Sequence, residues 1–247
     1  LMAYEDDAQT QAMRRLVNER DRLMRERTAL RNRLHDRVTI SFPELYKVFK
    51  SPCLQTPLRL LEHYPTARDV ARKRPATIAR IQVTARAEYI GIDRAEKLVA
   101  LARSSVASAT EPSDGDTIRF IVCQLIAIEE RLSCIDKTLD EWIASPDASE
   151  DRLSLPAQIN LLKTIPGIGM QGAATIVLRC GSILRYPSAR ALAAQLGTCP
   201  DRHQTGSGVE RGRLTHRGDR RSRPIVYLMA LMGSLADPAF AFHKWRY

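Results

Sequence analysis

The stretch Thr117–Ile143, TIRFIVCQLIAIEERLSCIDKTLDEWI, has the clearest hydrophobic periodicity in this 247-residue chain. Its apolar residues recur three and four positions apart without a break: Ile118, Ile121, Leu125, Ile128, Leu132, Ile135, Leu139 and Trp142. A seam of this kind over more than three heptads is typical of a helix that pairs along its length with another helix. The sequence therefore predicts a coiled-coil-like helix here, with a plain core helix of a bundle as the alternative.

A second long helix is predicted over residues 8–38, and it is the natural partner of the first. Its apolar residues also fall three and four positions apart, and nine arginines occupy much of the remaining surface. The pattern permits pairing within one chain, as an α-hairpin divided by an insert. It equally permits pairing between chains, as a homo-oligomer.

The region between the two helices, about residues 42–112, is broken by prolines into short segments. Among them, Ala76–Arg86 and Asp93–Ser104 are predicted as short helices. We therefore predict an all-α protein with two parts. Residues 1–150 form a helical middle region with the long helix pair and the insert, and residues 155–247 form a compact C-terminal domain.

The charge of the chain points to a polyanionic partner. Lys and Arg number 38 against 28 Asp and Glu, which gives a net charge of +10 and a pI near 9.7. Nucleic acid is the first candidate, and an anionic membrane surface is the second. No apolar run approaches the roughly 18 residues that a membrane-spanning helix needs, so we expect no transmembrane helix. We also expect no membrane partner, because the basic helix lacks aromatic anchors.

The segment Leu161–Val177, LLKTIPGIGMQGAATIV, has the form of a helix-hairpin-helix. Glycines at 167 and 169 allow the backbone to turn and to approach a ligand closely. Amides at the start of the second helix can bind a phosphate oxygen without reading the base sequence. The predicted phosphate-binding residues are Ile165, Gly167, Ile168, Gly169 and Met170, with Ile165 and Ile168 also packing into the core. The alternative is a structural helix connector without a ligand.

An arginine-rich segment follows at residues 201–223, with seven arginines against three acids. Guanidinium groups match the geometry of phosphate oxygens. We expect cationic contacts to DNA from Arg211, Arg213, Arg217, Arg220, Arg221 and Arg223. We further expect this segment and the Pro-Gly corner near Gly167 to share one surface. A solvated basic loop is the alternative.

Two hydroxyls in this segment, Thr205 and Ser207, lie on a glycine-flanked loop with His203 and His216 nearby in sequence. A hydroxyl nucleophile needs a base or a charge-stabilising environment, and spacing alone does not provide one here. A turn or a phosphate contact is the simpler role from the residues alone. The acidic residues form no convincing metal site.

Several of these segments together resemble one family. They are Ile165–Gly169 (IPGIG), Tyr186–Arg190 (YPSAR), Leu196–Pro200 (LGTCP), Gln204–Gly206 (QTG) and His216–Arg223 (HRGDRRSR). In order and spacing they resemble the C-terminal domain of the DEDD/serine insertion-sequence transposases, the IS-one-ten family. Phe42–Leu45 and Tyr64–Thr66 look like that family's middle region, so the resemblance covers nearly the whole chain.

The resemblance implies a DNA transposase or recombinase that cuts and rejoins strands through a serine hydroxyl. Thr205 stands at the position of the family's serine, and Ser207 is the fallback nucleophile. The family also implies a bridge RNA as guide, and a preceding RuvC-like domain that binds a divalent metal such as Mg²⁺ through four acids. We expect that domain to be missing here. The expectation is thus a truncated cytoplasmic, nucleoid-associated bacterial protein that binds DNA, needs no cofactor in this chain and cleaves poorly or not at all alone.

A non-catalytic module is the alternative function. It would be either a helix-hairpin-helix DNA-binding module or a helical assembly protein whose basic charge only keeps it soluble.

Overall fold

The computed structural model describes residues 8–83, 89–107, 112–144, 154–201, 213–214 and 217–239. The protein is all-α, as predicted; among the described residues the strands amount to one antiparallel pair of two residues each. The chain divides into two compact units. We call residues 21–133 the insert unit, and residues 1–20 together with 134–247 the hairpin unit. The long helices α1 (Ala8–Ser41) and α6 (Pro112–Ile143) contribute residues to both.

Short helices fill the insert unit between α1 and α6. They are η1 (Pro43–Lys47), α2 (Gln55–His63), α3 (Ala67–Ala71), α4 (Pro75–Ala79) and α5 (Ile92–Arg103). The core of this part includes Leu98 and Val99 of α5, which are almost completely buried. The predicted helix Ala76–Arg86 is wrong in length, because α4 ends at Ala79. Gln82 pairs instead with Tyr89 in an isolated β-bridge, an extended arrangement that suits the β-branched residues nearby.

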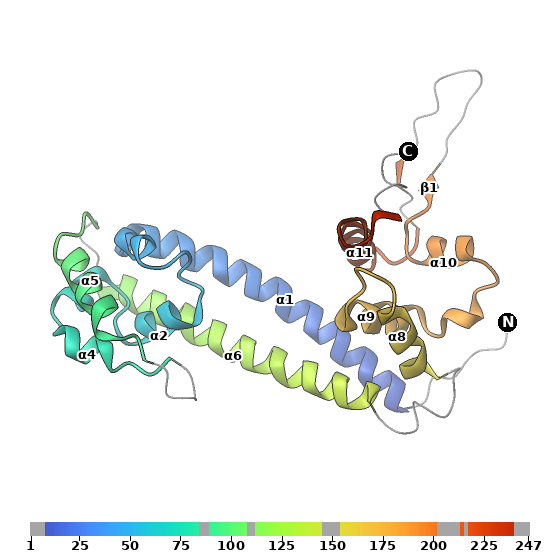
Figure 1. Cartoon of the computed structure of the whole chain (residues 1–247), viewed down its shortest axis with the longest axis horizontal. Helices are drawn as coiled ribbons and strands as arrows, with labels where there is room; N and C mark the ends of the chain where they lie inside the picture. The colour runs from blue at the N-terminus through green and yellow to red at the C-terminus, as the bar shows by residue number, and fades with distance from the viewer. Residues whose placement is uncertain are drawn as a thin grey trace, which may run out of the picture. The chain divides into compact units, whose positions relative to one another are not determined.

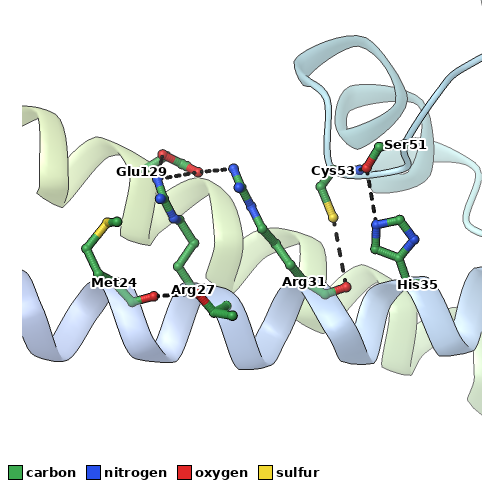
Figure 2. A network of polar contacts seen from close by, with 8 residues as sticks. Met24, Arg27, Arg31, His35, Ser51, Cys53 and Glu129 are labelled. Carbon is green, nitrogen blue, oxygen red and sulfur yellow. Dashed lines mark hydrogen bonds and ion pairs between the residues drawn. The ribbon is translucent and has the colours of Figure 1, made fainter. Parts of the chain in front are cut away.

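In the insert unit, α1 and α6 run antiparallel side by side (Figure 1). Arg27 and Arg31 on α1 both reach Glu129 on α6, at 3.2 and 2.9 Å, as Figure 2 shows. Six residues beyond Arg31 on α1, Arg37 pairs with Asp114 near the start of α6. The residue numbers rise along one helix as they fall along the other, which is the mark of antiparallel pairing.

The same helix pair continues in the hairpin unit, where Arg20 Nε lies 2.7 Å from Asp136 Oδ1. All eight predicted seam residues of α6 are buried. On α1 the buried stripe includes Val17, Leu30, Leu34 and Val38. Of the two arrangements that the sequence permits, the structure contains the pairing within one chain. A coiled-coil supercoil and a homo-oligomer stay predictions.

A polar network fixes the loop between η1 and α2 to helix α1 (Figure 2). His35 Nδ1 lies 2.9 Å from the Tyr46 hydroxyl, and His35 Nε2 lies 3.2 Å from Ser51 Oγ. The Cys53 amide donates to Ser51 Oγ, and the Cys53 thiol donates to the Arg31 carbonyl. Because the two ring nitrogens and the loop hydroxyl are all engaged, this network has a structural role.

The hairpin unit contains the remaining elements. They are α8 (Leu155–Lys163), α9 (Met170–Cys180), η2 (Ile183–Arg185), α10 (Ala189–Gln195), β1 (Pro200–Asp201), β2 (Arg213–Leu214) and α11 (Arg223–Ala236). Ile176, Cys180 and Leu196 form a buried cluster, against which Val226 and Met229 of α11 pack.

This division differs from the predicted boundaries at residues 150 and 155. The structure groups the first residues of α1 and the last ten of α6 with the C-terminal part of the chain. One reason is a hydrogen bond in which Arg14 Nε on α1 donates to the Leu178 carbonyl on α9. Tertiary contact, rather than the polar linker, therefore sets where one unit ends.

Candidate nucleic-acid interface

The turn between α8 and α9 has two tight hydrogen bonds that reverse the chain. The Ile165 amide donates to the Leu162 carbonyl and the Ile168 amide to the Ile165 carbonyl, each at 3.1 Å. Gly167 has φ = +86°, a left-handed conformation that favours glycine. The predicted order of helix, Pro-Gly turn and second helix is therefore present, while its assignment as a DNA-binding helix-hairpin-helix stays a prediction.

Gly167 packs against helix α11 of the same chain. A β-carbon placed on Gly167 would lie 2.6 Å from the Gly233 Cα and 2.8 Å from the Met232 carbonyl carbon. The close backbone approach that this glycine allows is thus to α11. The expectation that Ile165 packs into the core is wrong, because its side chain is 36% exposed at the outer side of the turn.

Gly169 has a different environment from Gly167. It is the N-cap of α9, with extended backbone and no side-chain cap hydrogen bond, and its carbonyl accepts from the Ala173 amide at 3.0 Å. A β-carbon on Gly169 would meet nothing within 4 Å. The start of α9 therefore adjoins open space, and amides at a helix start attract anions through the helix dipole.

The predicted cationic residues are only partly described. Arg217, Arg220 and Arg221 are exposed and Arg223 is half-buried at the start of α11. Arg213 lies in β2, and the structure describes its backbone alone. Thr205, Ser207 and Arg211 lie outside the described residues.

Asp219 organises the turn that leads into α11. Its carboxylate accepts from the Ser222 hydroxyl at 2.5 Å and from the Arg221 amide at 3.0 Å, and it lies 3.9 Å from Arg179 Nη1. Burial alone would raise the pKa of Asp219. The hydrogen bonds from Ser222 and Arg221 and the charges of Arg179 and Arg221 outweigh that effect, so the pKa is lowered. The acid is ionised and paired.

The Pro-Gly corner and the described arginines lie at opposite ends of the α9–α11 helix pair. Gly167 contacts Gly233 near the end of α11, whereas Arg179 near the end of α9 pairs with Asp219 just before α11. The ten residues from Arg223 to Gly233 span about 15 Å at 1.5 Å per residue. The two features are therefore separated along the helix pair, and the expectation that they share one DNA-binding surface stays a prediction.

A pocket of about 510 Å³ lies at the C-terminal end of α9. Arg14, Arg179, Arg185 and Arg221 line it together with Tyr186 and Asp219. The sequence analysis did not select Arg179 and Arg185. Each is a single arginine among apolar residues, so no local pattern marks it, and only the tertiary structure brings these residues together.

Comparisons with known proteins show what much of the hairpin unit is similar to. Residues 159–244 match the family model described as the transposase IS116/IS110/IS902 family. An insertion element IS116 protein of 44.8 kDa from Streptomyces clavuligerus is 25% identical over 227 residues, which cover 88% of this chain and 52% of that protein. The helical turn and the basic residues described above thus lie in the part of the chain that is similar to insertion-sequence transposases.

Two further relatives agree with this class. An insertion element IS110 protein of 43.6 kDa from Streptomyces coelicolor is 29% identical over 100 residues, covering 36% of this chain and 25% of that protein. A putative transposase from Sinorhizobium fredii is 30% identical over 99 residues, 40% of this chain and 24% of its own length. The family match over residues 159–244 and these relatives confirm the resemblance to the IS116/IS110/IS902 transposases.

The chain spans about half the length of the IS116 relative. The matches to the other two relatives cover about a quarter of the length of each. Among the described residues, no helix is both long and apolar enough to cross a membrane.

Proposed function

We propose that the hairpin unit binds the DNA backbone as part of an insertion-sequence transposase, which cuts and rejoins DNA strands. The observation that carries this proposal is the family match over residues 159–244, within which the open start of α9 lies. The net charge of +10 supports a polyanionic partner. The backbone amides near Gly169 and Met170 bind one phosphate, and the arginines before α11 supply further cationic contacts.

The first experiment replaces Gly169 with aspartate and measures affinity for duplex DNA. Aspartate is a favoured N-cap residue, so Gly169→Asp preserves α9 while its carboxylate occupies the amides and repels phosphate. We expect at least about a tenfold loss of affinity, equivalent to about 1.4 kcal/mol.

Gly169→Ala is the matched control, because its methyl group meets open space and adds no charge. We expect its affinity to stay within about twofold of the wild type. Wild-type affinity in a folded Gly169→Asp protein would remove the start of α9 from the DNA interface.

The strand-exchange chemistry is proposed for Thr205, at the position of the family serine, with Ser207 as the fallback. The hydroxyl oxygen attacks a backbone phosphorus. A P–O bond to the threonine oxygen forms as the P–O bond to the departing strand breaks. The proton lost by the hydroxyl is balanced by the proton that the departing oxygen takes up. The methyl group of threonine restricts χ1, so we propose a slower reaction than for serine.

A denaturation-resistant protein–DNA adduct tests this assignment. Because the chain alone is expected to cleave poorly, we expect a weak adduct from the wild type, a stronger one from Thr205→Ser and none from Thr205→Ala, whereas Ser207→Ala reacts as the wild type does. An adduct that survives in Thr205→Ala and disappears in Ser207→Ala would move the nucleophile. The absence of any adduct alongside salt-sensitive DNA binding would favour a non-catalytic DNA-binding module.

Other parts of the full reaction are also proposals. We propose a guide RNA because the family resemblance implies one, and a homo-oligomer because the apolar pattern of the long helices permits pairing between chains. We propose a cytoplasmic, nucleoid-associated location because transposases act on DNA. Divalent metal is proposed only for a RuvC-like domain. The described residues contain no group of three or more His, Cys, Asp or Glu suited to hold a metal ion, so no step is assigned to a metal here.

A further inference from the structure

The pocket at the C-terminal end of α9 is built from four separate parts of the hairpin unit. Arg14 comes from α1, Arg179 and Cys180 from the end of α9, and Arg221 from the turn before α11. Arg185 of η2 completes it. Four guanidinium groups and one carboxylate therefore line a single pocket of about 510 Å³.

Two of these guanidinium groups converge on Gly181. A β-carbon on that glycine would lie 3.1 Å from Arg185 Nη1 and 3.4 Å from Arg14 Nη2. Gly181 has φ = +75°, so a side chain here is unfavourable on both conformational and steric grounds. The absence of a side chain at Gly181 leaves space for the guanidinium groups of Arg14 and Arg185 beside it.

Each converging arginine is held by a further contact. The hydrogen bond from Arg14 Nε to the Leu178 carbonyl fixes that side chain at the end of α9. Arg185 lies over the Tyr186 ring, with 5.7 Å from its guanidinium carbon to the ring centroid, and the Tyr186 hydroxyl donates to the Cys180 carbonyl at 2.8 Å. The arginines are thus pre-organised before any ligand arrives.

The pocket keeps a positive charge at neutral pH. Arginine is always protonated, whereas burial raises the pKa of the Cys180 thiol to about 11 and keeps it neutral. The one acid, Asp219, is already engaged by Ser222, the Arg221 amide and Arg179. Several guanidinium groups in one pocket favour the binding of an anion that has several oxygen acceptors.

We propose that this pocket binds a second backbone phosphate of the DNA, distinct from the one at the start of α9. This inference rests on the proposed function, because DNA is the source of the phosphate. Helix α9 has 11 residues and spans about 16 Å, so its two ends hold different phosphates.

The test is the salt dependence of duplex DNA affinity in Arg185→Gln. Arg185 is exposed, so its replacement leaves the core intact. We expect about a tenfold loss of affinity, and a slope of log K against log salt that falls in magnitude by about 1. Arg185→Lys keeps the positive charge but loses the paired donors of the guanidinium group, so we expect it to keep most of the wild-type dependence of log K on log salt. The control Arg15→Gln removes an exposed arginine of α1 outside the pocket, and its affinity stays within about twofold.

Further measurements separate this inference from the proposed function. If Arg185→Gln and Arg15→Gln bind DNA equally well while Gly169→Asp loses affinity, the pocket proposal is overturned and the proposed function stands. If the wild type shows no salt-dependent DNA binding, both are overturned.

Inorganic pyrophosphate distinguishes a free anion from a DNA phosphate. We expect it to raise the melting temperature of the wild type but not of Arg185→Gln. Such stabilisation without any effect of Arg185→Gln on DNA binding would make the ligand a free anion and overturn the proposal. A lower melting temperature of Arg185→Gln without a change in DNA affinity would assign the arginine to capping α9.

Discussion

At the scale of single residues, two glycines of one turn have different physical roles. Gly167 has a positive φ and lies against the backbone of α11, so its missing side chain serves packing. Gly169 has a negative φ and an open surrounding, so its missing side chain leaves the start of α9 accessible. Replacing both glycines together would mix a folding effect with a binding effect, and for that reason we treat them separately.

Gly167→Ala is expected to destabilise the protein by about 2–4 kcal/mol, from left-handed strain and the collision with α11. Urea unfolding followed by circular dichroism measures the change. Gly169→Ala serves as the comparison and should unfold within about 0.5 kcal/mol of the wild type. Equal midpoints for the two variants would contradict the contact between the turn and α11.

Cys180 provides a pH-dependent prediction. Burial raises the pKa of its thiol to about 11, so little thiolate forms at pH 8. We expect iodoacetamide to alkylate Cys180 at least about 100-fold more slowly in the native protein than in urea, as measured by mass spectrometry. Because the folded state holds this proton more tightly, its contribution to stability is lost as the pH rises from about 9 to about 11. Rapid native labelling of Cys180 would refute its burial.

At the scale of elements, apolar seams and a few charge pairs join α1 and α6. The seam residues of α6 are buried along its whole length. Arg20 and Arg27 interrupt the apolar stripe of α1, and their partners on α6 are Asp136 and Glu129. Buried apolar area provides most of the stability, while charge pairs at fixed positions select one register over its neighbours.

Leu125→Ala is therefore expected to cost about 2–5 kcal/mol, because Leu125 is 1% exposed. Glu129→Gln removes the partner of two partly exposed arginines and should cost only about 0.5–1 kcal/mol. Thermal unfolding at low and high salt compares them. A larger loss for Glu129→Gln than for Leu125→Ala would show that the charge pairs dominate.

At the scale of the whole molecule, the proposed DNA contacts lie at both ends of one buried helix. The apolar middle of α9 packs against α11, its start adjoins open space at Gly169, and arginines line the pocket at its C-terminal end. In this proposal, a single helix carries both phosphate sites at a fixed separation, an arrangement that would position DNA without reading its bases.

The two sites are far enough apart to act independently. The losses in binding free energy for Gly169→Asp and Arg185→Gln should add within about 0.5 kcal/mol in the double variant. Fluorescence anisotropy of labelled duplex DNA, measured at one salt concentration, gives the binding free energies of the single and double variants for this comparison. A double variant no weaker than either single variant would mean that both changes act on one contact.

Much of the fold follows from sequence patterns. The seam from Ile118 to Trp142 required a partnered helix, and the Pro-Gly turn near Gly167 required a break between two helices. Such features depend on residues close in the sequence, whose spacing is visible directly. The end of α4 at Ala79 was missed, because helix length there depends on the extended pairing of Gln82 with Tyr89.

The all-α class, the two long helices, the turn and the basic charge follow from the amino-acid sequence alone, because periodicity and composition are local or additive properties. The packing of the helices was needed to show that Gly167 faces α11, that the arginines before α11 lie away from the Pro-Gly corner, and that Arg14 and Arg185 both approach Gly181. These are contacts between residues far apart in the chain. They depend on how the helices pack, and no spacing along the sequence encodes that packing directly.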